Sequence, residues 1–133
     1  MYRIFSDGGS RGNPGPSAYA IVVTENGKII HQHSEFLGIN TNNYAEYRGL
    51  IAGLTKAIEM KAENVEFIMD SMLVIKQMNG EYKVKAENIR NLYLDAMALS
   101  SMIPNIRFRN VRRSEMLIPV ADALVNKELD MHQ

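Results

Sequence analysis

Cysteine, long apolar runs and net charge are all missing from this sequence. Without cysteine, the chain has no disulfide, no thiolate metal ligand and no cysteine nucleophile. No apolar run approaches the roughly 18 residues that a membrane-spanning helix needs, and the N-terminus lacks the charged-then-apolar layout of a signal peptide. These absences predict a cytoplasmic protein with no membrane partner.

Charge gives no direct indication of a partner, because 15 basic residues balance 15 acidic ones. Runs of basic residues are usually solvated surface. That interpretation applies to six basic residues in the second half of the chain, Lys83, Lys85, Arg107, Arg109, Arg112 and Arg113. The sequence has no repeat, low-complexity tract or obvious linker. With 133 residues, of which 46% are apolar and 23% charged, residues 1–133 are expected to form a single domain.

Strand and helix patterns predict an α/β protein. Residues 2–6, 18–24 and 28–37 read as strands, and the Asn26-Gly27 pair predicts a hairpin turn between the second and the third. Apolar residues at helical spacing predict helices over 43–60 and 87–103. Apolar or alternating runs predict strands at 65–69 and 106–110. A brief helix is expected near 71–79, and a last helix near Pro119. This order predicts an antiparallel meander that leads into a helix-connected, partly parallel sheet.

The stretch SDGGSRGNPGPSAYA, residues 6–20, follows the first predicted strand. It holds four glycines and two prolines. Glycine permits backbone angles that are closed to other residues, whereas proline fixes φ and removes a donor. We therefore expect a shaped, non-helical turn here, with Asp7 at its mouth.

Four acidic residues stand out by their positions. Asp7 and Asp70 end predicted strands, where ligands gather in open α/β sheets, and Glu46 and Asp122 fall in the first turns of predicted helices. Each has a plain alternative role. Asp70 could cap a helix, Glu46 could form a capping box with Asn43, Asp122 could balance a helix dipole, and Asp7 could stabilise a turn. The functional interpretation depends on all four occurring together.

Converging carboxylates repel one another unless a cation lies between them. Hard divalent ions such as Mg²⁺ take oxygen ligands and fill their remaining positions with water and substrate phosphate. Two such ions about 3.5–4 Å apart can activate water and stabilise the leaving oxygen of a phosphodiester. The four acids therefore suit a metal-dependent hydrolysis that needs no cysteine or serine nucleophile.

Four separated segments, DGGSRGNPGP, TNNYAEYRGL, FIMDSMLVIKQMNGEYKVK and ADALVNKELD, together resemble the type I ribonuclease H family. They resemble its branch with a Gly-Asn-Pro-Gly turn and a short NGEYKVK-type loop in place of a long basic protrusion. The resemblance covers nearly the whole chain in the right order. It implies the ribonuclease H fold, a five-stranded mixed sheet flanked by helices. It also implies hydrolysis of the RNA strand of RNA–DNA hybrids by two metal ions, Mg²⁺ or Mn²⁺, leaving 5′-phosphate and 3′-hydroxyl ends.

Site residues follow from the resemblance position by position. The catalytic and metal-binding acids fall on Asp7, Glu46, Asp70 and Asp122, and the implied substrate contacts are Gly8, Asn13, Thr41, Asn42, Asn43 and Ser71. Short amide side chains suit the wide, shallow minor groove that displays 2′-hydroxyls. Lys83 and Lys85 lie two apart in an extended segment, so they point to one side and are candidates for binding phosphates.

The chain departs from the family pattern in its loop before the last helix, and two rival functions remain. Many family members carry a histidine in the loop before the last helix, where this chain has Arg112 and Arg113. One rival is a hybrid-binding module without catalysis. The other is an ATP-binding protein with a phosphate loop of the sugar-kinase and actin type, which normally needs a second domain that 133 residues cannot supply. Metal-dependent cleavage of a labelled hybrid separates the three.

Overall fold

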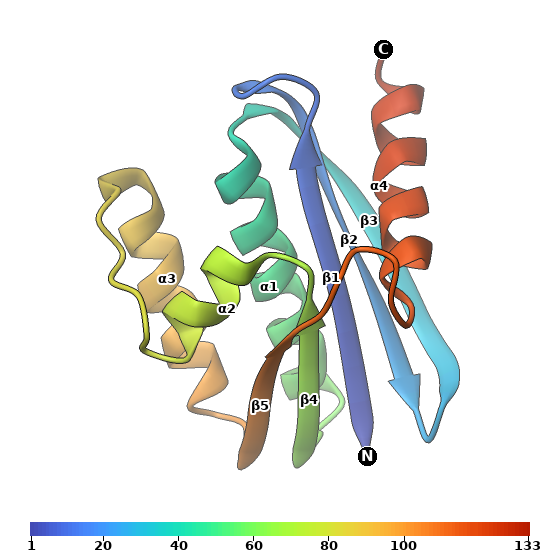
Figure 1. The fold of residues 1–133 in the computed structure, drawn as a ribbon. Coiled ribbons are helices and arrows are strands. Elements are labelled where there is room, and N and C mark those ends of the chain that lie inside the picture. The colour runs from blue at the N-terminus through green and yellow to red at the C-terminus, as the bar shows by residue number, and fades with distance from the viewer.

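A five-stranded mixed sheet forms the centre of the structure, a computed structural model that describes all 133 residues. The strand order is β3-β2-β1-β4-β5 (Figure 1). The strands are β1 (Tyr2–Ser10), β2 (Gly15–Glu25), β3 (Lys28–Asn40), β4 (Asn64–Met69) and β5 (Asn105–Asn110). The helices are α1 (Asn42–Glu59), α2 (Met72–Met78), α3 (Glu87–Ser100) and α4 (Ile118–Met131).

The sheet combines an antiparallel half with a parallel half. β1, β2 and β3 form an antiparallel meander, whereas β4 runs parallel to both β1 and β5. At the β2–β3 turn, Asn26 and Gly27 have φ angles of 51° and 85°, as a two-residue hairpin turn of this kind requires. The predicted meander and helix-connected parallel strands are confirmed.

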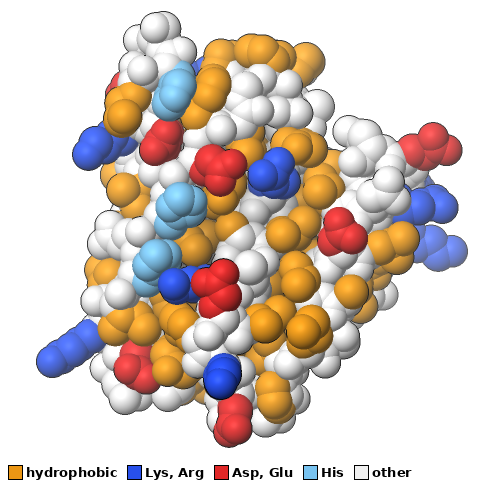
Figure 2. Space-filling model, turned by 180° about the vertical axis from the view of Figure 1, so that it is seen from behind, with side chains coloured by type: hydrophobic (Ala, Val, Ile, Leu, Met, Phe, Trp, Pro, Cys, Tyr) orange, Lys and Arg blue, Asp and Glu red, His pale blue; other side chains and the backbone are white.

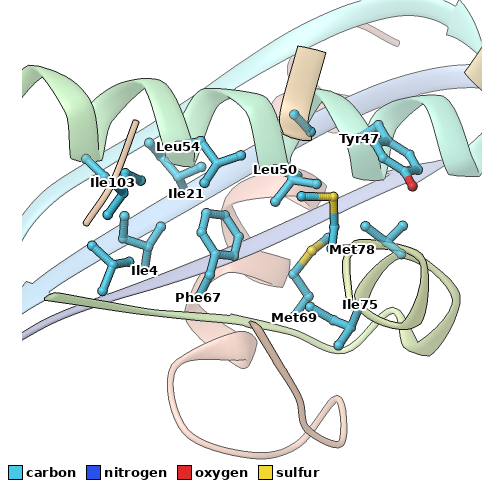
Figure 3. Close-up of a cluster of buried hydrophobic side chains, with 14 of the residues drawn as sticks. Ile4, Ile21, Tyr47, Leu50, Leu54, Phe67, Met69, Ile75, Met78 and Ile103 are labelled. Carbon is cyan, nitrogen blue, oxygen red and sulfur yellow. The ribbon is translucent and has the colours of Figure 1, made fainter. Parts of the chain in front are cut away.

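Helices cover both faces of the sheet and create two apolar clusters. The larger cluster lies beneath α1, α2 and α3 and includes Ile4, Leu54 and Phe67 (Figure 3). The smaller one lies beneath α4 and includes Ile68 and Ile118. Phe67 and Ile68 are consecutive in β4 and point into opposite clusters, which explains why this strand is an unbroken apolar run.

The strands at the N-terminal end are longer than predicted. β1 continues through Ser10 and β2 begins at Gly15, so the turn is confined to residues 11–14. Asp7 therefore lies inside β1 and does not end it, which corrects the prediction. Pairing with β2 continues from Tyr2 to Ser10, and the resulting backbone hydrogen bonds outweigh the weak strand preference of glycine.

None of the helices has the length and apolar character of a membrane-spanning segment.

Candidate active site

Four acidic side chains from four different elements line one hollow of about 280 Å³. Asp7 comes from β1, Glu46 from α1, Asp70 from the segment after β4, and Asp122 from α4. The sequence places these residues as far as 115 positions apart (122 − 7). The fold thus brings together all four acids that the sequence analysis singled out.

The parallel pairing of β1 and β4 explains why Asp7 and Asp70 meet. The last paired residues of the two strands are Phe5 and Ile68. Asp7 lies two residues beyond Phe5 within β1, and Asp70 lies two residues beyond Ile68, directly after β4 ends at Met69. Residues two apart on a strand share a face, so both acids continue the same row. Beyond this point β1 stays paired with β2, while the chain after β4 turns away into α2. The hollow opens where the two strands part.

Gly8 allows α1 to approach β1 closely enough to bring in Glu46. A Cβ atom at Gly8 would lie 2.4 Å from the Ala45 carbonyl oxygen and 2.7 Å from the Glu46 nitrogen. Any side chain here would push α1 away from β1. The predicted substrate residue Gly8 therefore has a clear structural role in placing the neighbouring acid.

The cap roles considered for Glu46 and Asp70 are wrong. Thr41 caps α1, and its hydroxyl accepts a hydrogen bond from the Tyr44 amide at 3.2 Å. Ser71 caps α2, and its hydroxyl accepts from the Val74 amide at 3.3 Å. Threonine and serine fill these positions well because a short hydroxyl reaches the first free amides of a helix. Both acids are left without a capping function.

Glu46 and Asp122 lie just beyond the first turns of their helices, which corrects the predicted positions. α1 begins at Asn42 and α4 at Ile118, and neither has an acidic residue in its first turn. Pro119 is the second helical residue of α4 and not its first. The dipole explanation for Asp122 weakens accordingly, because that effect falls off within the first turn.

Burial and mutual repulsion perturb the acids of the hollow. Burial, followed by the charges of Asp70 and Asp122, raises the pKa of Asp7 to about 8. Burial is also the main cause that raises the pKa of Glu46 to about 7, against a hydrogen bond from Ser71 that lowers it. Burial raises the pKa of Asp70 as well, and Arg113 partly offsets this. These groups are costly to ionise together, as expected where carboxylates crowd without a cation.

Arg113 supplies a positive charge beside the acids, in the loop where many family members have histidine. Its Nε lies 3.8 Å from Oδ2 of Asp70, and its side chain is 82% exposed. Arg112 contacts Glu115 in the same loop, with its Nε 4.0 Å from a Glu115 carboxylate oxygen. The exposed Arg112–Glu115 pair contributes little to stability. Arg113 is free to exchange Asp70 for another anion.

The donor set suits hard divalent ions, although the acids are not arranged around one point. No three acidic or histidine side chains of the chain are placed so that they could hold one ion as they stand. The hollow nevertheless presents only carboxylate oxygens as charged ligands, and magnesium prefers such ligands. Cations would offset the burial of these charges and the repulsion between them, which together raise the pKa of three of the acids. The side chains therefore have the right ligand atoms for the ion. Rotation of these side chains would have to bring the oxygens around a common point.

Hydrogen bonds join the predicted substrate residues of the β1–β2 turn and the start of α1. The Asn13 side-chain oxygen accepts from the Asn42 amide, and the Asn42 side-chain oxygen accepts from the Ser10 amide, each at 3.0 Å. These bonds tie the β1–β2 turn to the start of α1, where Thr41 and Asn43 also lie. Gly8 and Asn42 line the hollow itself. Ser71 directly follows Asp70 in the chain, and it lowers the pKa of Glu46. Six predicted contacts thus lie in or beside the site.

Two predicted residues lie apart from the hollow. Lys83 and Lys85 are exposed in the loop between α2 and α3 and do not line it. Their distance from the acids leaves them as candidates for contacts further along a long substrate.

Sequence reasoning did not assign several residues that line the hollow to the site, among them Arg11 and Asn126. The Asn126 amide donates to the Asp122 carboxylate at 3.4 Å, and a guanidinium nitrogen of Arg11 lies 2.7 Å from Asp130. Four-residue spacing on α4 links Asn126 to Asp122 and could have indicated the first contact. Nothing local to Arg11 indicates the second.

A larger hollow of about 400 Å³ lies between α1 and β3 and includes Tyr19, His31 and Arg48 in its lining. Figure 2 shows the back of the molecule, where histidine side chains lie among acidic, basic and apolar ones. Glu59 is the one acid in that lining. The concentration of carboxylates identifies the smaller hollow as the candidate active site.

Comparisons with known proteins agree with this geometry. A family model described as reverse transcriptase-like matches residues 5–128. The N-terminal RNase H domain of the Mycobacterium tuberculosis protein Rv2228c superposes with a TM-score of 0.93 at 42% identity, covering 98% of this chain and 94% of that domain. LC11-RNase H1, solved with an RNA/DNA hybrid, superposes with a TM-score of 0.91 at 34% identity over 99% of both chains. This chain belongs to the type I ribonuclease H family. Its predicted ribonuclease H fold is confirmed.

The curated relatives of this ribonuclease H family member are longer proteins. The M. tuberculosis bifunctional protein Rv2228c is 43% identical over 129 residues, which are 96% of this chain and 35% of that protein. Ribonuclease HI of Halobacterium salinarum is 35% identical over 127 residues, which are 95% of this chain and 63% of that protein. The chain thus spans about a third of the first relative and somewhat under two thirds of the second.

Proposed function

We propose that this chain is an endoribonuclease that hydrolyses the RNA strand of RNA–DNA hybrids. The observation that carries the proposal is the hollow lined by Asp7, Glu46, Asp70 and Asp122. The chain also covers 99% of a ribonuclease H that was solved in complex with such a hybrid. We further propose that residues 1–133 act as one catalytic domain, and that the protein is cytoplasmic.

The four acids would hold two divalent cations, Mg²⁺ or, as a substitute, Mn²⁺. When bound, such ions lower the pKa of a water nucleophile and stabilise the leaving oxygen of the phosphodiester. The residues themselves supply the negative charge that makes such binding favourable. Since burial raises the pKa of Asp7 and Glu46 to about 8 and about 7, both would release protons as the cations bind.

The start of α1 would meet the minor groove of the hybrid. Asn42 and Asn43 are short amides on a fixed helix, and the bonds to Asn13 and Ser10 hold Asn42 in place. Amides both donate and accept, so they can bind 2′-hydroxyls and base edges without strong sequence preference. Thr41, Gly8 and Ser71 lie in or beside the same site. Lys83 and Lys85 would bind phosphates further along the duplex.

Arg113 would help to bind the scissile phosphate region. It pairs with Asp70 only loosely, at 3.8 Å, and a guanidinium is suited to phosphate oxygens. Neither rival function is favoured. The acids that an inactive hybrid-binding module could lose are all present, and the chain covers 99% of the LC11-RNase H1 chain that was solved with a hybrid.

The experiment is cleavage of a hybrid labelled on each strand, with analysis of the product ends. We expect RNA fragments with 5′-phosphate and 3′-hydroxyl ends and an intact DNA strand, because water is the nucleophile. A cyclic 2′,3′-phosphate would mean that the RNA's own 2′-hydroxyl attacks, and it would overturn the proposed mechanism.

A further inference from the structure

A row of arginines lies outside the acidic hollow, on the sheet face that carries α4. Arg3, Glu66 and Arg107 are register partners across β1, β4 and β5, and such partners share a face of a sheet. Ile68, two residues after Glu66, belongs to the cluster beneath α4, which identifies the face. Arg109, two residues after Arg107, lies on it as well.

No packed helix hides this row. α4 packs against β1, β2 and β3, and it lies away from β5 (Figure 1). The side chains of Arg3 and Arg109 are about half exposed, and Arg107 is also exposed. Buried Glu66 orders two of them, with one carboxylate oxygen 2.9 Å from Arg3 and the other 3.8 Å from Arg109. One buried acid therefore holds two guanidinium groups that keep donors free for solvent or a ligand.

The row continues to the active site. Arg109, Arg112 and Arg113 line one depression of about 630 Å³ together with Asp70. The nearby acid Glu115 is taken up by Arg112. We call Arg3, Arg107, Arg109, Arg112 and Arg113 the arginine track. Its five positive charges face two acids outside the catalytic set, so the track is net positive within a neutral chain.

We propose that the arginine track binds the phosphodiester backbone of single-stranded RNA that continues from the cut strand. This rests on the proposed function, because the track begins beside Asp70, where the RNA strand would be cut. Arginine binds phosphate oxygens with two parallel donors, and Arg107 and Arg109 are about 6.6–6.8 Å apart along β5. No aromatic side chain belongs to the track, so it would hold the backbone without stacking on bases.

A duplex fits the track poorly, and this selects a single strand. Asp7 and Asp70 lie towards the C-terminal ends of the inner strands β1 and β4. The hybrid would lie across that end of the sheet, whereas the track runs from it down the sheet face. A nucleic-acid duplex is stiff, with a persistence length of about 50 nm for DNA. It therefore does not bend sharply from the end of the sheet onto the sheet face. A single strand that leaves the duplex can make that turn.

The test is binding of one hybrid in three forms: blunt, with a single-stranded tail on the RNA strand, and with a tail on the DNA strand. Tails at each end are measured separately, with EDTA present so that no strand is cut. The proteins are the wild type, the double variant Arg107→Ala/Arg109→Ala, and a control, Arg90→Ala/Lys61→Ala, which removes two exposed positive charges elsewhere.

The wild type and the control should bind the RNA-tailed hybrid more tightly than the blunt one. The salt dependence of binding to the tailed hybrid should be steeper by about 0.7 log units for each phosphate held on a single strand. The double variant should lose the advantage of the RNA tail and up to about 1.4 of that slope. Equal binding of blunt and RNA-tailed hybrids, an unchanged slope in the double variant, or a gain from the DNA tail instead would overturn the inference.

Cleavage of the blunt hybrid with Mg²⁺ keeps the two proposals distinguishable. Cleavage of the blunt hybrid without any effect of the RNA tail would refute the track and leave the proposed function standing. An intact hybrid together with tail-dependent binding that the double variant loses would refute the function and support the track as a surface for single-stranded RNA.

Discussion

Replacing Asp7 by asparagine should stabilise the metal-free protein, and more so as the pH rises. Burial and the Asp70 and Asp122 carboxylates raise the pKa of Asp7 from 3.8 to about 8 in the folded chain. A raised pKa means that the folded state favours the protonated acid. The stability that this provides is complete below about pH 3.8 and is lost as the pH rises to about 8. Asparagine has the shape of the neutral acid and does not titrate.

The size of the effect follows from the same values. The difference between about 8 and 3.8, at about 1.36 kcal/mol per pH unit, sets an upper bound of about 6 kcal/mol. Asp7 is only 8% exposed, so solvent screening is weak. Water entry and relaxation of the neighbouring acids reduce the cost of burying a charge, and we expect about 3 kcal/mol at pH 8. For a chain of this length that corresponds to a rise in Tm of roughly 10 °C.

Thermal unfolding in EDTA from pH 4 to pH 8 measures this directly, with Asp95→Asn as an exposed control. The Tm of the wild type should fall towards pH 8, whereas that of Asp7→Asn should fall less, so that the two curves separate. Added Mg²⁺ should then raise the Tm of the wild type more than that of the variant. Parallel curves for the two proteins would show that Asp7 is not held in a repulsive, buried setting, and would refute this reasoning.

Three further predictions concern individual residues. Glu46→Gln should lower hybrid cleavage by orders of magnitude while the Tm holds or rises, because the variant keeps its shape but loses the charge that we propose binds a cation; unchanged activity would contradict this. Lys83→Ala/Lys85→Ala should weaken hybrid binding equally across sequences and flatten its salt dependence by up to about 0.9 log units per phosphate contact. An unchanged salt dependence would show that these lysines do not bind phosphates. Asp122→Asn should impair cleavage severely and raise the Mg²⁺ concentration required, while Glu115→Gln should do little because Glu115 contacts Arg112 in the loop; the reverse ranking would place the fourth acid in that loop.

The sequence predicted the sheet and the acids because both leave local patterns. The helical spacing over 43–60 anticipates α1, which spans Asn42–Glu59, and a carboxylate directly after a buried strand indicated Asp70. The position of Asp7 within β1 was missed because a stretch rich in glycine and proline is typical of a turn. Only the pairing with the partner strand shows that the strand continues. Pairing of β1 with β2 as far as Ser10 is a tertiary effect that overrides local preference.

Other features of the site depend on contacts between distant residues. Arg11 and Asp130 are 119 positions apart (130 − 11) and meet at 2.7 Å only because α4 packs beside the β1–β2 turn. Both cap residues were misjudged by a position or two, because several short polar side chains near a helix start compete for the same amides. The arginine track requires the register of β1, β4 and β5, which no single stretch of sequence contains.

The central claim is tested most directly by one comparison of cleavage. A labelled RNA–DNA hybrid and a DNA duplex of the same sequence are each incubated with Mg²⁺ and either the wild type or Asp70→Asn. The wild type should cut only the RNA strand of the hybrid, only when Mg²⁺ is present, and Asp70→Asn should leave both substrates intact. A hybrid that stays intact with the wild type, or equal cleavage by wild type and variant, would contradict the assignment of this hollow as a ribonuclease H active site.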